Sequence, residues 1–268
     1  MHGRASAADG APPGAPGFVP RAIAVGGYAI AMAYLEAAVV MYLQRALAIS
    51  PTTLFPLRDP TPLGGLGSVE LGRELATLVM LAAVGWLAGQ RPLERLAWSA
   101  VAFGAWDIGY YGWLRLFSGW PTSPGSWDLL FLVPVPWVGP VWAPVAVSAA
   151  LIGCGLAAAR HLRAGRSLSV TPANVAIGVA GGALVVLSFT WDAGRILEGG
   201  TPDGFPWPLF VAGMMLAGWG AAIALRSPSA HRAVRRPADR RGAGAMTTAR
   251  ARLREPRAGR ASGIERST

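Results

Sequence analysis

Long apolar runs dominate the pattern of hydrophobic and polar positions along the chain. Six of them occupy residues 22–44, 68–89, 96–117, 139–162, 172–196 and 208–225. An α-helix of about 20 residues crosses a hydrocarbon core of about 30 Å, because each residue advances the helix by about 1.5 Å. The pattern therefore predicts an all-α, polytopic bundle of six transmembrane helices, with the lipid bilayer as its surroundings.

A shorter apolar segment lies between the third and fourth runs. Residues 126–137 are too few to span a bilayer, and Pro134 and Pro136 interrupt any helix there. We predict an interfacial or re-entrant segment.

The two ends of the chain differ in composition from its middle. Residues 1–20 and 227–268 contain too little apolar side chain to build a core, so we expect both to be disordered. The domain organisation predicted is a transmembrane domain at residues 21–226 between a disordered N-terminal segment and a disordered Arg-rich tail.

Composition and charge sharpen this prediction. The chain is 53% hydrophobic and 14% charged, and its single Cys excludes a disulfide scaffold. All 24 basic residues are Arg, and 12 of them lie at residues 226–268 beside three acidic residues, so this end carries +9 of the net +10. The positive charge could keep the tail on the cytoplasmic side of the membrane, or the tail could bind anionic lipid. Nucleic acid is the less favoured partner.

Arginines outside the tail predict the orientation. Short cytoplasmic loops carry an excess of positive charge. Placing the N-terminus and, by the even helix count, the C-terminus in the cytoplasm puts most loop arginines on that side: Arg4, Arg21, Arg91, Arg95, Arg160, Arg163 and Arg166.

Ionisable residues within the predicted helices are the candidates for function. Each costs about 2.5 to 3.5 kcal/mol on insertion scales, so each needs a partner or a role. They concentrate in the outer half, and spacings of three and four residues turn them toward shared helix faces. The candidate binding cluster comprises Glu36, Glu70, Arg73, Glu74, Asp107, Tyr110, Tyr111, Arg115, Asp128, Asp192 and Arg195.

The charges of this cluster do not balance. With Arg45 included, six carboxylates oppose four arginines, which leaves two surplus negative charges if all share one cavity. Protonation, a divalent cation or a cationic substrate could compensate for them. Because the cluster lacks His and Cys, a metal site would consist of oxygen ligands and suit Mg, Ca or Mn. No cofactor is identified from the sequence.

The polar residues of the candidate cluster could also have purely structural roles. Asp192 and Arg195 could form a local salt bridge, and residues 70–74 could form an ion-pair ladder on one helix. Asp107 and Glu36 could be polar contacts between helices. Gly178 and Gly182 are spaced so that a neighbouring helix could approach closely.

A weak internal repeat relates three helical hairpins, each with a late acid followed by Arg: Glu36 and Arg45, Asp107 and Arg115, Asp192 and Arg195. Two motifs, WDxxYYxWL at residues 106–114 and WDLLFLVPVPWVGP at residues 127–140, resemble a family of bacterial multi-pass inner-membrane proteins of no known activity. The resemblance covers residues 22–225. It implies a bacterial cytoplasmic membrane and assigns no role to any residue.

Three functions remain open. The chain could be a carrier or binder of an ion or small polar solute, with the cluster as its recognition site. It could be a structural or accessory subunit of a membrane complex. It could also be an intramembrane enzyme acting on a lipid or lipid-linked substrate, with Asp107 or Glu36 as general acid and base and arginines holding a phosphate. The sequence does not decide whether it is an enzyme.

Overall fold

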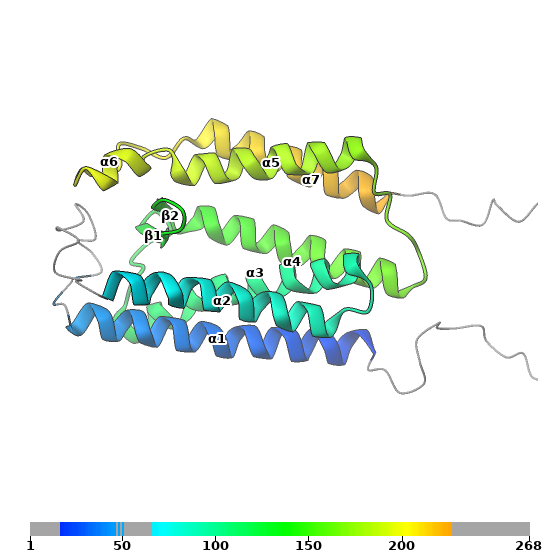
Figure 1. Ribbon diagram of the computed structural model, residues 1–268, viewed down its shortest axis with the longest axis horizontal. Coiled ribbons are helices and arrows are strands. Elements are labelled where there is room, and N and C mark those ends of the chain that lie inside the picture. The colour runs from blue at the N-terminus through cyan, green and yellow to red at the C-terminus, as the bar shows by residue number, and fades with distance from the viewer. Residues whose placement is uncertain (1–16, 47, 49, 51–65, 227–268) are drawn as a thin grey trace, which may run out of the picture. The chain divides into compact units, whose positions relative to one another are not determined.

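The computed structural model describes residues 17–46, 48, 50 and 66–226, which form mainly long helices (Figure 1). Each predicted apolar run coincides with one long helix: α1 Phe18–Ala46, α2 Leu66–Ala88, α3 Pro92–Ser118, α4 Trp142–Arg163, α5 Pro172–Thr190 and α7 Trp207–Leu225. A five-residue helix, α6 Ala193–Leu197, follows α5.

The predicted disordered ends lie almost wholly outside the described residues, at 1–16 and 227–268. The boundary at residue 20 is corrected, because α1 already begins at Phe18. The ring of Phe18 packs on Trp98 of α3, with 5.6 Å between ring centroids. This contact gives the first turn of α1 an apolar partner that its own sequence does not reveal.

Within the described residues, five helical segments are long and apolar enough to cross a membrane. They are α1, α2, α4, α7 and the stretch Pro172–Leu197, which joins α5 and α6. The chain is therefore a multi-pass helical membrane protein.

Helix α3 differs from these five in polarity rather than in length. Its 27 residues extend for about 40 Å. Asp107, Tyr110 and Tyr111 interrupt its apolar positions. It packs against α1, α2 and α4, and Trp98 and Leu114 are fully buried there. Helix α3 can be the most polar long helix because other helices cover it.

The segment between α3 and α4 is a short β-hairpin within an otherwise all-α fold. Strand β1, Trp127–Phe131, pairs antiparallel with β2, Trp137–Pro140, with a register shift between Leu129 and Phe131. Pro134 and Pro136 lie in the connection, where no ladder hydrogen bond needs their missing N–H groups. The prediction that this segment does not span the bilayer alone agrees with the hairpin.

Helices α5 and α7 lie side by side in direct backbone contact (Figure 1). A Cβ added at Gly181 would lie 2.3 Å from the backbone nitrogen of Ala217, and one at Gly213 would lie 2.8 Å from the carbonyl oxygen of Gly181. The prediction for Gly182 is wrong, since a Cβ there meets nothing within 4 Å. The glycine one position earlier faces the neighbouring helix.

Aromatic side chains join this helix pair to α4 and the hairpin. Trp142 of α4 stacks on Trp207 of α7 with 4.1 Å between ring centroids. Phe189 of α5 stacks on Trp137 of β2 at 6.4 Å and meets Phe205 at 5.4 Å. The hairpin is thereby fixed between α5 and the helices that precede it.

In the first turn of α3, Glu94 joins three helices. The sequence analysis did not identify this residue. Its carboxylate lies 3.5 Å from Arg21 of α1 and 3.3 Å from Arg163 of α4, and it accepts a 3.4 Å hydrogen bond from the Trp98 indole. Glu94 is 4% exposed. Its place just after Pro92, among loop arginines, is the sequence signal that could have indicated it.

The α5–α7 contact predicts that Gly181→Ala destabilises the protein. The new methyl group would collide with backbone rather than with a flexible side chain, and overpacking costs about 1 to 3 kcal/mol. Thermal unfolding in detergent should show a lower Tm than for Gly182→Ala, the matched control whose Cβ has open space. Equal Tm values for the two variants would contradict the contact.

The Glu94 anchor predicts that Glu94→Leu is strongly destabilising. It would leave the mostly buried guanidinium groups of Arg21 and Arg163 without their shared carboxylate, at a cost of about 3 to 5 kcal/mol. Thermal unfolding should show a large loss of Tm beside Glu198→Leu, whose side chain is exposed at the end of α6. Equal losses in both variants would show that Glu94 is no anchor.

Candidate functional site

Helix α2 carries a short charged face that reaches α1. The Nε of Arg73 donates to Glu70 at 3.0 Å, one turn away on the same helix. Arg73 also forms an ion pair with Glu36 of α1, whose carboxylate accepts a 3.2 Å hydrogen bond from Thr77. The Glu70–Arg73 pair of the predicted ladder is therefore present and extends to Glu36 of α1, whereas Glu74 makes no ion pair with Arg73 among the described residues.

Glu74 joins the same face of α2 to the β-hairpin. Its two carboxylate oxygens lie 3.2 and 3.1 Å from the backbone nitrogen of Leu132, which donates to them between the strands. Glu74 is 7% exposed. The carboxylate thus satisfies a backbone N–H that the hairpin leaves unpaired.

On α3, Asp107 faces α4. Ser148 donates a 2.8 Å hydrogen bond to its Oδ2, and within the described residues no donor reaches its Oδ1. Both side chains are buried, at 5% and 1% exposure. Asp107 therefore keeps one acceptor oxygen available inside the fold.

Asp128 begins the hairpin and meets the next turn of α3. The hydroxyl of Tyr111 donates to its Oδ2 at 3.0 Å, and the backbone N–H of Leu129 donates to its Oδ1 at 2.9 Å. Burial raises the pKa of Asp128 to about 6, although both hydrogen bonds favour the charged form. Removal from water is thus the stronger influence on this carboxyl group.

Tyr110 lies among these groups. The charged groups of Arg73, Glu70, Asp107 and Asp128 are close enough to interact electrostatically with its hydroxyl group. Its ring stacks on Trp106 at 6.3 Å. We call the assembled residues the Tyr110 cluster: Glu36, Glu70, Arg73, Glu74, Asp107, Tyr110, Tyr111 and Asp128.

The Tyr110 cluster has more negative charge than the sequence analysis counted. Its five carboxylates and one guanidinium leave a formal surplus of four negative charges rather than two. The difference arises because three arginines that were counted, Arg45, Arg115 and Arg195, and one carboxylate, Asp192, lie outside the cluster.

Arg115, Asp192 and Arg195 are bound by partners close to them in the sequence. Arg115 donates to the carbonyl oxygens of Gly119 and Pro121 just beyond its own helix. Arg195 pairs at 3.3 Å with Asp203 rather than with Asp192, which accepts a hydrogen bond from the Asp203 backbone. The structure therefore separates Arg115, Asp192 and Arg195 from the cluster, because the loops after α3 and α5 supply closer partners.

Two indole groups beside the cluster lack acceptors. The Nε1 atoms of Trp106 and Trp137 are buried without a hydrogen-bond partner. Phe131 contacts both rings, at 6.4 and 5.8 Å between centroids. Aromatic faces thus border the acidic groups on the hairpin side. The two sequence motifs include these aromatic residues, but the motifs alone do not show that the rings lie beside the acidic groups.

From the sequence, we considered a divalent cation site with oxygen ligands, but the described residues provide no set of ligands for it. Within the described residues, no three Asp, Glu, His or Cys side chains come together as a group that could hold a metal ion. His161 is not part of the cluster. It lies in the last turn of α4, with its Nε2 atom 3.2 Å from the carbonyl oxygen of Ser167, whereas Ser148, which binds Asp107, lies nearer the start of α4.

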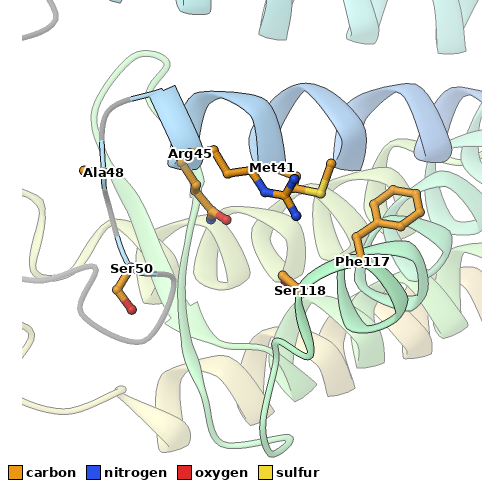
Figure 2. A pocket seen from close by; sticks show the side chains of 7 residues that line it. Met41, Arg45, Ala48, Ser50, Phe117 and Ser118 are labelled. Atoms are coloured by element: carbon orange, nitrogen blue, oxygen red, sulfur yellow. The ribbon is translucent and has the colours of Figure 1, made fainter.

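A separate pocket of about 570 Å³ lies where α1 and α3 end (Figure 2). It shares no residue with the Tyr110 cluster. Its lining combines polar and apolar side chains: Met41, Gln44, Arg45, Ala48, Ser50, Phe117 and Ser118.

Compared with protein-family models, with curated proteins and with solved structures, the chain has no match. The family that its two motifs resemble is therefore not identified by these comparisons. The structure shows the architecture alone: a multi-pass helical membrane protein with five candidate membrane spans among the described residues.

Proposed function

We propose that the protein is a membrane-embedded binder and carrier of a small organic cation, which the Tyr110 cluster recognises. The observation that carries the proposal is the surplus of four formal negative charges in the Tyr110 cluster, in which four of the five carboxylates, Glu36, Glu74, Asp107 and Asp128, are buried. Uncompensated charge is costly away from water, so these carboxylates require protons or a cationic ligand. A cation that exchanges with protons would satisfy both conditions.

The arrangement of the carboxylates favours an organic cation over a metal ion. Metal ions need several oxygen ligands around one point, whereas an ammonium group can be bound by one carboxylate and an aromatic face. Asp107 offers its free Oδ1 atom, and Trp106 and Tyr110 lie on the same helix within one turn. We assign Asp107 as the principal acceptor and the neighbouring rings as the apolar wall.

A second candidate is a structural or accessory subunit of a membrane complex. It is favoured by the fact that the same carboxylates join different elements. Glu36 joins α1 to α2, Glu74 joins α2 to the hairpin, and Asp107 joins α3 to α4. In this alternative, the polar contacts hold helices together and the surplus charge is carried by protons.

We further propose six spans, with both termini on the cytoplasmic side of a bacterial inner membrane. Helix α3 would be the sixth span, since its length suffices and neighbouring helices cover its polar residues. The end of the helices that holds Arg21, Arg91, Arg95, Arg160 and Arg163 would then face the cytoplasm, as positive loops do.

Cation binding predicts that methylammonium chloride raises the Tm of the detergent-purified protein more than sodium chloride of equal concentration. Asp107→Asn should lose this response, with binding at least tenfold weaker, because it removes a charged hydrogen-bond acceptor. Asp203→Asn, at a site 75% exposed, should respond like the parent. A folded Asp107→Asn variant with an unchanged response would exclude the assignment, and absence of any response in the parent would favour the structural alternative.

The six-span arrangement predicts opposite compartments for the two ends of α3. Compartment-specific reporters fused after Gln90 and after Gly119 should report the cytoplasm and the external side respectively, and one fused after Arg226 the cytoplasm. If the Gln90 and Gly119 fusions report the same compartment, α3 does not span and the proposed orientation fails.

A further inference from the structure

The pocket between the ends of α1 and α3 is lined by Arg45. Within the described residues, no carboxylate lies within ion-pair distance of Arg45, and Glu36, its partner in the sequence repeat, is paired with Arg73 instead. Figure 2 shows the Arg45 side chain alongside Met41 at the pocket. Among the residues that the structure describes, the five guanidinium donors of Arg45 near the end of α1 therefore have no anionic partner.

Apart from Ser50, the polar groups of the pocket lie in the last turns of the two helices. Gln44 and Ser118 line it together with Arg45, and the Ser118 hydroxyl donates to the Leu114 carbonyl oxygen at 2.9 Å. A guanidinium beside an amide NH₂ group suits the oxygens of a phosphate, which Arg can bind with two parallel hydrogen bonds.

Met41 and Phe117, which precede these polar residues on α1 and α3, are apolar. Phe117 lines the pocket, and its ring meets Tyr34 at 5.2 Å and Trp113 at 5.9 Å. Tyr34 is 45% exposed and lies on the same face of α1 as Met41 and Arg45, at spacings of seven and eleven residues. Eleven residues correspond to about 16 Å along the helix, so an aromatic track leads from the arginine toward the middle of α1.

We propose that this pocket binds the headgroup of an anionic phospholipid. Arg45 holds the phosphate, and the acyl chains follow the surface formed by Met41, Phe117 and Tyr34. Charge complementarity and the order of the lining, polar at the helix end and apolar toward its middle, match a lipid at the bilayer surface. The site shares no residue with the Tyr110 cluster and does not depend on the function proposed for it.

Native mass spectrometry of the full chain in detergent tests this site, with dioleoyl phosphatidylglycerol and dioleoyl phosphatidylcholine as separate probes. The parent should retain phosphatidylglycerol in preference to phosphatidylcholine, and Arg45→Gln should bind phosphatidylglycerol about tenfold more weakly. Arg45→Lys should restore part of the affinity, since it returns the charge without the two-bond geometry. Arg91→Gln, an exposed arginine at the opposite end of α3, is the matched control and should leave this affinity unchanged.

Three results would overturn the proposal. The first is equal phosphatidylglycerol affinity for the parent and a folded Arg45→Gln variant, whose exposed position should leave the Tm unchanged. The second is equal binding of the two lipids by the parent. The third is displacement of phosphatidylglycerol by millimolar inorganic phosphate, which would make free phosphate the ligand rather than a lipid.

Discussion

The structure depends on one constraint: α3 carries its polar side chains into surroundings from which water is largely excluded. Every neighbour of α3 supplies a partner. Ser148 of α4 reaches Asp107, Asp128 of the hairpin reaches Tyr111, and Arg21 of α1 reaches Glu94. Buried polar groups that lack partners cost free energy, so these contacts restrict how the surrounding helices can pack. The helix that is least suited to lipid by composition is therefore the one around which the others assemble.

The helices could be predicted from the sequence because a bilayer imposes a length and an apolar composition on each segment. The hairpin could not, since the apolar stretch around Pro134 has no periodicity that separates strand from interfacial coil. Eight of the eleven candidate site residues come together, because polar side chains on helices of one bundle share the side away from lipid. The Glu70–Arg73 pair within α2 was predictable from its spacing, whereas the pairs that form across helices were not. Glu36 is nearer in sequence to Arg45 than to Arg73, yet the structure pairs it with Arg73.

Charge is distributed unequally along α1 and α3. At their first turns, Glu94 is shared by two arginines, which leaves a positive surplus. Further along both helices, Arg73 is the one guanidinium for the five carboxylates of the Tyr110 cluster. In the proposed orientation, this distribution would place the arginines around Glu94 near the cytoplasmic lipid headgroups and the carboxylates of the Tyr110 cluster toward the other side. The same gradient favours entry of a cation from the side where the acidic groups lie.

Contacts that hold helices together and a site that binds a cation are not exclusive. A purely structural network reaches its lowest energy when acids and bases balance, because each unpaired buried charge weakens the fold. Here Arg73 satisfies Glu36 and Glu70, while Asp107 has a hydroxyl as its partner and Asp128 has a phenol and a backbone N–H. Those neutral donors position the two carboxylates without neutralising them. The α1–α2 half of the cluster is thus built like a structural ion pair, whereas the half formed by α3 and the hairpin retains the charge that a cation would compensate.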